Sequence, residues 1–249
     1  MQYKLKNKVA VITGGNSGIG YATAQDFKEQ GAKVVITGRR LEPLKKAAEE
    51  LGVEYFLSDQ SNLSDTDKLV AFVKEKYDKV DSLVINAGFG AYIPLEQTTE
   101  AQYNEIMDVN FKGAYFTLSK FSPILNDAAA VIFISSITAS IAMLHTTVYA
   151  ASKAAINSLV KTSAIELAPR QIRVNAVSPG VTHTALFSKS GMDENTVNGL
   201  LESLKPQIPL RKIGTSEDVA KLVTHLVSND STFITGTEFL IDGGHTIRQ

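Results

Sequence analysis

The stretch that decides the fold runs from residue 9 to residue 20 and reads VAVITGGNSGIG. Its first four residues form a short apolar run, which predicts a buried strand, and the amphipathic stretch that continues to Gln30 predicts a helix. A strand, a glycine-rich turn and a helix in this order place backbone N–H groups and the positive end of the helix where they can face a pyrophosphate. The segment therefore predicts a dinucleotide cradle, although glycines at these positions are also compatible with a simple turn.

The glycines of this turn have separate expected tasks. Gly14 lets the chain turn, Gly18 lets the cofactor approach, and Gly20 lets the helix and the strand pack closely. The cofactor-binding residues predicted from the turn are Gly14, Asn16, Ser17, Gly18, Ile19 and Gly20.

The end of the second predicted strand, residues 33–37, indicates which dinucleotide binds. Gly38, Arg39 and Arg40 follow this strand, and no acidic residue stands there. Dinucleotide-binding folds use an acid at this place to bind a ribose 2′-hydroxyl, whereas an arginine accommodates a 2′-phosphate. We therefore expect NADP(H), bound at Gly38 and Arg39, without excluding NAD(H), and we expect Arg40 to be solvated.

Asp59 follows the third predicted strand, residues 53–57. Its carboxylate is placed to accept a hydrogen bond from the amino group of an adenine. A cap of the turn formed by residues 59–61 is an alternative role for the same side chain, and the sequence leaves both open.

A tyrosine and a lysine, Tyr149 and Lys153, stand four residues apart, and Ser136 precedes the tyrosine by thirteen residues. Residues at i and i+4 share one face of a helix, so we expect the ammonium to lie beside the phenol. Free tyrosine titrates near pH ~10, and a neighbouring cation lowers that pKa, which makes the phenol a usable acid or base at neutral pH. An exposed tyrosine beside a solvated lysine is the ordinary alternative for such a pair.

Three sets of residues line up along the chain, namely Thr13-Gly14-x-x-x-Gly18-x-Gly20, Asn86-Ala87-Gly88, and Ser136 with Tyr149-x-x-x-Lys153. Together they resemble the short-chain dehydrogenase/reductase family, and the resemblance extends from the first strand to the Asp-Gly-Gly at residues 242–244. It implies an NAD(P)-dependent oxidoreductase. Because members of that family are commonly tetramers, it also implies a homotetramer.

The resemblance implies roles for residues that spacing alone does not explain. Asn110 matches the family asparagine that supports a water-linked proton relay through its helix backbone. Asn86, Ala87 and Gly88 match the segment that supports the sheet and packs along the cofactor. Lys153 matches the lysine that also holds the hydroxyls of the nicotinamide ribose.

A second group of matched residues follows the strand predicted over 173–177. Pro179, Gly180, Thr182 and Thr184 match the positions at the nicotinamide end of the cofactor. The resemblance implies that Thr184 and the backbone near Thr182 hold the carboxamide.

The chemistry implied by the resemblance is the interconversion of a ketone or aldehyde and an alcohol by hydride transfer. Ser136 is expected to hydrogen-bond the carbonyl oxygen of the substrate while Tyr149 donates a proton to it. The expected catalytic residues are therefore Asn110, Ser136, Tyr149 and Lys153. A Ser-His-Asp hydrolase is disfavoured because no Gly-x-Ser-x-Gly elbow surrounds the serine.

The chain has 249 residues, 44% of them hydrophobic, and no proline- or serine-rich linker divides it. Continuously apolar strand candidates alternate with helical stretches, one of which starts with a capping box at residues 99–102. This pattern predicts one domain over residues 1–249, an α/β Rossmann-type fold with a parallel sheet of about seven strands and helices on both faces. The strand candidates begin at Val9, Lys33, Val53, Ser82, Ala130, Arg173 and Phe239.

Charge and composition exclude several classes of function. The formal net charge is −1, so no basic field offers itself to nucleic acid or to an anionic membrane. The apolar run after Lys4, Lys6 and Lys8 is too short for a signal peptide or a membrane span. Without cysteine, thiol chemistry and disulfides are excluded, and we expect a cytoplasmic protein. The histidines have no metal-like spacing, so no metal site is expected.

Residues 184–211 form a long stretch without a strand pattern, and we expect them to close over the substrate as a lid. Candidates for the substrate pocket, each of which also suits ordinary packing, are His145, Leu144, Met143, Phe89, Tyr92, Phe187 and Leu204. These mostly apolar side chains, without a carboxylate-binding arginine, indicate an uncharged small-molecule ketone, aldehyde or secondary alcohol.

Three functions remain open at this point. A carbonyl reductase is the first expectation. A 3-oxoacyl-(acyl-carrier-protein) reductase would need a basic surface beside the pocket, and the sequence leaves open whether Lys112, Lys120 and Arg173 converge. A dinucleotide-sensing regulator without turnover would have little reason to retain the serine, tyrosine, lysine and asparagine together at these spacings.

Overall fold

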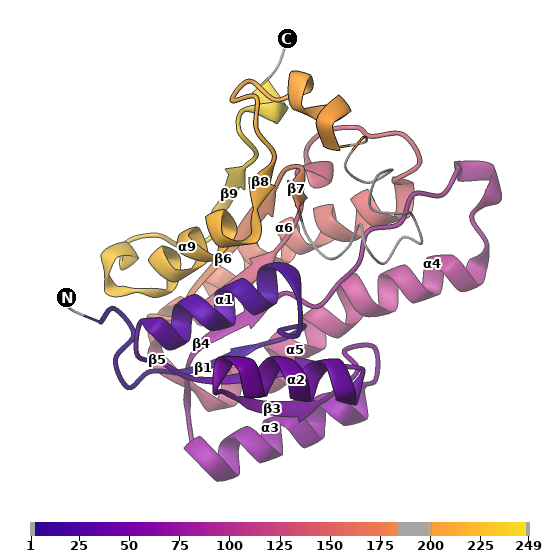
Figure 1. Cartoon of the computed structure of the whole chain (residues 1–249). Helices are drawn as coiled ribbons and strands as arrows, with labels where there is room; N and C mark the ends of the chain where they lie inside the picture. The colour runs from indigo at the N-terminus through magenta and orange to yellow at the C-terminus, as the bar shows by residue number, and fades with distance from the viewer. Residues whose placement is uncertain (1–2, 184–198, 200, 248–249) are drawn as a thin grey trace.

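The computed structural model describes residues 3–183, 199 and 201–247, and within them a seven-stranded parallel sheet forms the centre of the molecule (Figure 1). The strand order is β3-β2-β1-β4-β5-β6-β9, which confirms the predicted doubly wound fold. The strands are β1 (Val9–Ile12), β2 (Lys33–Gly38), β3 (Glu54–Leu57), β4 (Val80–Ile85), β5 (Leu125–Ile134), β6 (Arg173–Pro179) and β9 (Glu238–Ile241). The largest difference from the predicted strands is in β5, which begins at Leu125 rather than Ala130 and shifts register beside β4.

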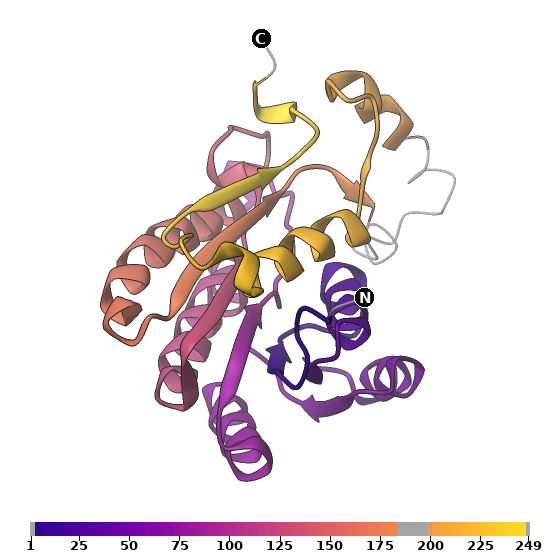
Figure 2. The same ribbon diagram turned by 90° about the vertical axis from the view of Figure 1, so that its left-hand side faces the viewer.

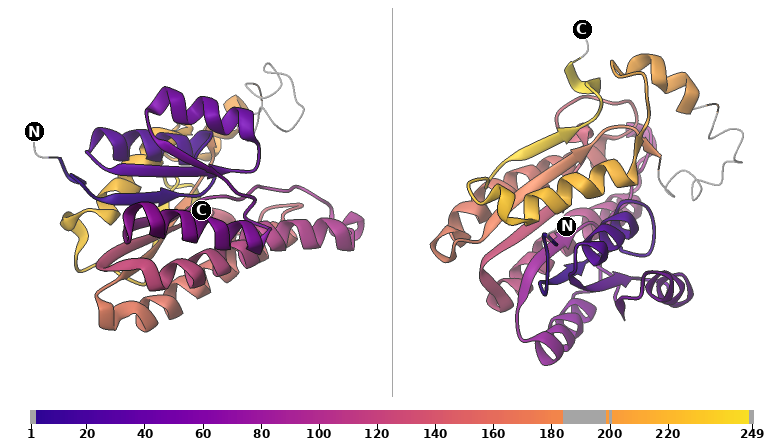
Figure 3. Two further views of the ribbon diagram at one scale, coloured as in Figure 1. Left: turned by 90° about the horizontal axis from the view of Figure 1, so that it is seen from below. Right: turned by 60° about the vertical axis from the view of Figure 1, so that its left-hand side comes forward.

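Helices cover both faces of the sheet (Figure 2). One face carries α1 (Gly18–Glu29), α2 (Leu41–Leu51) and α9 (Ser216–Val227). The other face carries α3 (Leu63–Tyr77), α5 (Ala114–Phe121) and α6 (Thr147–Leu167). Seen from below, the sheet lies between two helical layers (Figure 3). Helix α4 (Glu100–Met107) continues through a π-turn, η2 (Asp108–Gly113), into α5.

Alternate residues of the strands build two separate cores. Val9 and Val11 of β1 pack with α3, α5 and α6, whereas Ala10 and Ile12 pack with α1, α2 and α9. Successive side chains of a strand point to opposite faces, and both faces of a parallel sheet are buried under helices. Burial of both faces of the sheet therefore explains why the central strands are continuously apolar, as predicted from the sequence.

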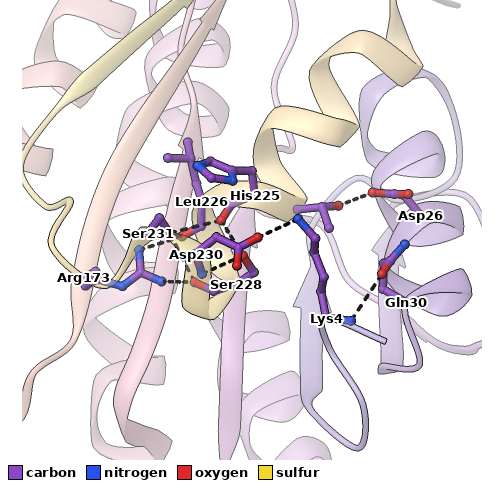
Figure 4. Close-up of polar contacts among 10 residues, drawn as sticks. Lys4, Asp26, Gln30, Arg173, His225, Leu226, Ser228, Asp230 and Ser231 are labelled. Carbon is purple, nitrogen blue, oxygen red and sulfur yellow. Dashed lines mark hydrogen bonds and ion pairs between the residues drawn. The ribbon is translucent and has the colours of Figure 1, made fainter. Parts of the chain in front are cut away.

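The amino ends of the strands carry polar contacts that hold the chain together (Figure 4). Arg173, the first residue of β6, is buried and donates to the carbonyls of Leu226 (2.6 Å) and Ser228 (3.3 Å) at the end of α9. Lys4 pairs with Asp230 at 2.6 Å in the same region. Carbonyls at the last turn of a helix have no partner within it and favour a cation, so Arg173 caps α9.

Shorter elements lie at both edges of the sheet. Strand β7 (Thr182–His183) pairs with β8 (Gly214–Thr215) in a small sheet that the sequence did not predict. The single-turn helices are η1 (Leu95–Gln97), η3 (Ser122–Ile124), η4 (Ile137–Ala139), η5 (Ala168–Arg170), η6 (Lys205–Gln207), η7 (Asn229–Ser231) and η8 (His245–Ile247). Most of the predicted lid, residues 184–198 and 200, lies outside the described residues. None of the helices within the described ranges is long and apolar enough to cross a membrane.

Candidate active site

The strand order reverses between β1 and β4, and the segments that follow these two strands are bonded to each other. The Thr13 hydroxyl accepts hydrogen bonds from the N–H groups of Asn86 and Ala87, each at 3.0 Å. The Asn86 amide donates in return to the carbonyls of Thr13 (2.9 Å) and Gly14 (3.1 Å). Doubly wound folds bind their ligands where the strand order reverses, so these bonds fix the rim of the predicted cofactor site.

The glycine turn opens at the start of α1. Gly14 has a φ of +66°, a left-handed conformation that favours glycine. A Cβ on Gly20 would lie 2.3 Å from the Gly14 carbonyl oxygen, so the first turn of α1 packs directly on the turn. The remaining predicted residues are half-exposed there, namely Asn16, Ser17, Gly18 and Ile19. Backbone N–H groups at an accessible helix start fit the pyrophosphate of a dinucleotide.

The end of β2 lies beside this turn. A Cβ on Gly38 would lie 3.0 Å from Asn16 Oδ1, which places the two segments in contact. Arg39 and Arg40 are exposed, and neither guanidinium makes a hydrogen bond or an ion pair with any residue that the structure describes. Both cations are therefore available to an anionic ligand at this edge of the sheet.

Asp59 takes the role of a turn cap. Its Oδ1 accepts hydrogen bonds from the backbone N–H of Ser61 at 2.9 Å and from the Ser61 hydroxyl at 2.7 Å. This is one of the two roles that the sequence left open. The contact with an adenine amino group stays a prediction.

Ser136 and Tyr149 are brought together beyond the end of β5. The Ser136 hydroxyl lies close enough to the Tyr149 hydroxyl to lower the pKa of the phenol through hydrogen bonding. Ser136 Oγ also accepts from the backbone N–H (3.2 Å) and the hydroxyl (3.0 Å) of Thr138. With both of these bonds directed at its oxygen, the serine has its own proton left to donate. Thr138 was not predicted from the sequence, where its only signal is a hydroxyl two residues after the serine.

Lys153 lies on the same face of α6 as Tyr149, as the spacing predicted. It is 5% exposed, its Nζ donates to the Ile134 carbonyl at 2.8 Å, and Nζ lies 5.9 Å from the centre of the Tyr149 ring. Burial lowers the pKa of Lys153 to about 8.

The electrostatics at Tyr149 differ from the prediction that the lysine lowers the pKa of the phenol. Burial raises the pKa of Tyr149, and the hydrogen bond from Ser136 lowers it by less. The Lys153 ammonium is directed to a main-chain carbonyl, so in this arrangement burial outweighs the neighbouring cation. The sequence could not predict this because spacing gives the proximity of two groups and not their burial.

Asn110 lies in the π-turn between α4 and α5 and is 1% exposed. Its Oδ1 accepts from the Phe89 N–H at 3.0 Å, and its Nδ2 donates to the Phe89 carbonyl at 3.0 Å and to Ser152 Oγ at 3.3 Å. Ser152 Oγ donates in turn to the Tyr149 carbonyl at 2.7 Å. Asn110 therefore joins the loop after β4 to the helix that carries the tyrosine. π-turns are frequent at functional sites, but neither this turn nor Ser152 was predicted.

Gly88 lies between the loop after β4 and α6. A Cβ on this residue would lie 3.0 Å from Asn110 Oδ1 and 3.5 Å from Lys153 Nζ. Gly88 is itself exposed, so the narrow space beside the lysine opens to the outside. The predicted segment Asn86 to Gly88 thus borders both the glycine turn and the Lys153 ammonium.

The predicted nicotinamide end follows β6. Pro179 is the last residue of β6, and a Cβ on Gly180 would lie 2.7 Å from Asp242 Cβ, so the chain passes close to the end of β9. The Thr182 hydroxyl donates to the Gly180 carbonyl at 3.0 Å. Thr184 lies outside the described residues.

The substrate end is partly described. His145 has a φ of +65°, its carbonyl accepts from the Ile93 N–H at 2.6 Å, and it lines a shallow recess beside Tyr149. The recess is lined among the described residues by Ala91, Ile93, Thr98, Ile106, His145, Thr146, Thr147, Val148 and Tyr149. Leu144, 84% exposed, and Leu204, half-buried, do not line it. Phe187 lies outside the described residues. Tyr92 is 62% exposed and close enough to raise the pKa of Tyr149 electrostatically.

The arrangement suits proton transfer to an oxygen atom placed beside two hydroxyls. The hydroxyls of Ser136 and Tyr149 are neighbours, Lys153 adds a buried ammonium beside the ring, and Asn110 ties this helix to the loop beside the glycine turn. Within the described residues no cluster of three or more histidines, aspartates and glutamates could hold a metal ion.

Similar sequences and structures extend over the whole chain. The profile of the family described as Enoyl-(Acyl carrier protein) reductase matches residues 14–246. The NADP-dependent (R)-specific alcohol dehydrogenase of Lentilactobacillus kefiri is 35% identical and covers 99% of this chain and 99% of its own. The 3-oxoacyl-(acyl-carrier-protein) reductase FabG of Thermotoga maritima is 35% identical and covers 98% of this chain and 100% of its own. The crystal structure of a short-chain dehydrogenase/reductase from Brucella melitensis, described as a glucose/ribitol dehydrogenase, has a TM-score of 0.92 and 28% identity, covering 98% and 99% of the two chains.

Proposed function

This chain belongs to the short-chain dehydrogenase/reductase family and is an NAD(P)-dependent oxidoreductase, and on that basis we propose that it is a carbonyl reductase that uses NADP(H). The observation that carries the proposal is the proximity of the Ser136 and Tyr149 hydroxyls, beside the buried Lys153 ammonium. This cluster lies at the carboxyl edge of the sheet, the edge at which the glycine turn opens.

The residues of the cluster divide the chemistry of ketone reduction. A bound nicotinamide supplies a hydride to the carbonyl carbon. Ser136 donates a hydrogen bond to the carbonyl oxygen, and the Tyr149 hydroxyl gives that oxygen a proton as the C=O bond becomes a C–O single bond. Lys153 would hold the nicotinamide ribose and would stabilise the tyrosinate that remains, and a water-linked path past Asn110 would return a proton to the tyrosine. The side chains contribute position and charge.

The shallow recess beside Tyr149 gives one wall of the proposed substrate position, and its lining favours an uncharged substrate. That lining is mostly aliphatic and hydroxyl-bearing, and His145 is the one basic side chain in it among the described residues. Tyr92 and Leu144 add exposed apolar surface nearby in the chain. A relative named as an (R)-specific alcohol dehydrogenase supports the same class of substrate.

A spectrophotometric panel tests this proposal. Acetophenones, β-ketoesters and sugars are each offered with NADPH and with NADH, and oxidation of the cofactor is followed. We expect turnover of the aromatic ketones and ketoesters. Activity confined to charged substrates or polyols would overturn the carbonyl reductase assignment.

Preference for NADP(H) is supported by Arg39, an exposed arginine after β2 whose guanidinium has no partner among the described residues. We expect Arg39→Ala to lower kcat/KM for NADPH about tenfold, because it removes a charge-assisted bond to the 2′-phosphate, and to leave kcat/KM for NADH within about twofold. Arg40→Ala, the neighbouring exposed arginine, is the matched control. Wild-type turnover with NADH equal to or better than with NADPH would contradict the preference.

A 3-oxoacyl-(acyl-carrier-protein) reductase is the second candidate, favoured by a relative of that name. Each of the three cations that were considered for carrier binding already has a partner within the chain. Arg173 is buried as the cap of α9, Lys112 pairs with Asp108 at 3.1 Å, and Lys120 pairs with Asp67. If carrier-bound acetoacetate reacts more than about tenfold better than a free acetoacetyl thioester, this second function replaces the first. A regulator without turnover is the third alternative, and any turnover in the panel excludes it.

We also propose that the protein is a cytoplasmic homotetramer. Large apolar side chains are exposed on the C-terminal region and on α6, among them Phe233 at 103%, Ile247 at 79% and Ile165 at 76%. Exposed side chains of this kind mark subunit interfaces when they lie in contiguous patches. Light scattering tests the assembly, and a monomeric mass would contradict it.

A further inference from the structure

Gln60 is a buried polar side chain in the turn between β3 and α3, and it contacts both segments that frame the candidate active site. It is 7% exposed, and its Nε2 donates to the Ala87 carbonyl at 2.8 Å and to the Val109 carbonyl at 2.9 Å. Ala87 belongs to the loop after β4, and Val109 directly precedes Asn110 in the π-turn. One carboxamide therefore joins the two segments.

The bond to Val109 falls at an irregular place in the helix. Backbone hydrogen bonds in a π-turn leave the i→i+4 register of the flanking α-helices, and a carbonyl there benefits from a donor outside the helix. Gln60 is such a donor for Val109. The next residue, Asn110, is bonded to the Phe89 backbone through both ends of its own amide. Gln60 and Asn110 thus connect the same two segments at neighbouring positions.

Packing alone does not explain a glutamine at this position. Gln60 Oε1 is buried and has no hydrogen-bond partner among the residues that the structure describes. A buried acceptor without a partner is unfavourable, and methionine would fill a similar volume without one. Turning the amide over would place its oxygen against two carbonyl oxygens, so the donating orientation is set by the chemistry of its neighbours. Donation to both carbonyls is what distinguishes glutamine from an apolar residue here.

The main chain of the same turn also contacts the π-turn. A Cβ on Gly113, the last residue of the π-turn, would lie 2.2 Å from the Gln60 carbonyl oxygen. The two backbones are therefore in direct contact, and a displacement of Gln60 is passed on to the π-turn.

We propose that Gln60 is a positioning residue for Asn110, because its two hydrogen bonds set the separation between the loop after β4 and the π-turn. The consequence for catalysis rests on the proposed oxidoreductase function. A displaced Asn110 alters the proton path and the helix that carries Tyr149, whereas the recess for the substrate has other lining residues. Loss of the Gln60 amide is therefore expected to lower kcat and to leave KM for the ketone nearly unchanged.

The experiment compares Gln60→Met, which removes both donors at similar volume, with Gln60→Asn, which keeps an amide that is one methylene too short to reach both carbonyls. Gln25→Met is the control, because the Gln25 amide is exposed and donates to Glu29 within α1. Hydrogen exchange of the protein without cofactor is measured over residues 87–90 and 108–114. Steady-state kinetics with NADPH and a reactive ketone give kcat and KM separately, well below the melting temperature of each variant.

We expect faster exchange in both segments for Gln60→Met, about a tenfold lower kcat and a KM within about twofold, with Gln60→Asn between it and wild type. The control variant should match wild type in every readout. A lower melting temperature with unchanged kcat and unchanged exchange in the two segments would overturn the proposal. If the wild type shows no turnover, the proposed function fails while the exchange measurement still tests the positioning of Asn110.

Discussion

The structure buries two cations, Arg173 and Lys153, at opposite edges of the same sheet. Both are less than a tenth exposed, burial lowers the pKa of both, and both donate to main-chain carbonyls. Arg173 distributes its donors over two carbonyls at the end of α9, where they close a helix. Among the described residues Lys153 donates to one main-chain carbonyl, that of Ile134. It lies beside the Tyr149 ring at the carboxyl edge of the sheet, where the predicted cofactor site is.

The difference shows that burial of a charge does not by itself identify a functional group. At the amino edge the polar side chains complete the backbone, as Asp81 does when it accepts from the Val9 N–H at 2.8 Å. At the carboxyl edge the hydroxyls of Ser136 and Tyr149 lie close to each other, and neither is needed to complete a helix end. We therefore expect substitutions at the amino edge to change stability and substitutions at the carboxyl edge to change activity.

The largest effect is expected for Tyr149→Phe. Removing the proton donor should lower kcat by about 10³, within the usual range for an acid in the reaction, while the melting temperature stays within a few degrees. Tyr103→Phe on α4, a half-exposed tyrosine away from the cluster, is the matched control and should retain wild-type kcat. If Tyr149→Phe turns over at more than a tenth of the wild-type rate, the carboxyl edge does not differ from the amino edge in its importance for activity.

Lys153→Met should lower activity without lowering stability. We expect kcat/KM to fall about 100-fold, because the ribose contact and the charge behind the phenol are lost. A lysine with a folded pKa of about 8 carries a penalty of roughly 3–4 kcal/mol for its charged form relative to an unfolded lysine near 10.5. The variant should therefore be at least as stable as wild type at pH 7, measured by urea unfolding.

The direction of the Lys153 pKa shift predicts how the unfolding free energy changes with pH. Between about pH 8 and 10.5 the unfolded lysine holds its proton and the folded one has lost it, so the unfolded state binds more protons. The unfolding free energy of wild type should rise with pH across this window relative to that of Lys153→Met. If the difference in unfolding free energy between the two proteins does not change with pH, the pKa of Lys153 is not lowered in the folded protein.

Arg173→Met should have the opposite pattern to Tyr149→Phe. Removing the cap of α9 is expected to cost about 2 kcal/mol of unfolding free energy, because the helix end loses a cation and two donors. The kinetic constants at 25 °C should stay within about twofold of wild type. A large loss of kcat with an unchanged unfolding free energy would instead show that Arg173 contributes to activity.

Thr138→Val is expected to have the smallest effect. The change keeps the shape of the side chain and removes a hydroxyl that donates to Ser136 at 3.0 Å, so the serine is less firmly oriented. We expect about a tenfold lower kcat, with KM for the ketone within a factor of two. Thr162→Val, which removes an exposed hydroxyl farther along α6 and outside the recess, is the control.

The sequence predicted the parts of the molecule that local patterns determine. The apolar strands, the left-handed Gly14 and the close approach at Gly20 follow from the sequence around them, and the capping box at Thr99 was also predicted and is present. The meeting of Ser136 with Tyr149 required the family resemblance, because the two residues stand on different elements.

Long-range contacts and burial were beyond the reach of sequence patterns. The π-turn at Asn110 has no local breaker residue, and the partners of Gln60 are the carbonyls of residues 87 and 109, far away in the chain. The pKa of Tyr149 was predicted in the wrong direction because it depends on the depth at which the phenol is buried. The alternation of residues along a strand determines on which face of the sheet each side chain lies, whereas the burial of a side chain depends on the whole assembled fold.

Transfer of a labelled hydride tests the function of the carboxyl edge most directly. Wild-type protein is incubated for a single turnover with NADPH carrying deuterium at C4 of the nicotinamide, in each stereochemical form, and a reactive ketone. We predict that one of the two forms gives an alcohol with one deuterium on the carbinol carbon, detected by mass spectrometry. Alcohol without deuterium from both forms, or a bound cofactor that transfers nothing to any ketone of the panel, would contradict the assignment of this site to carbonyl reduction.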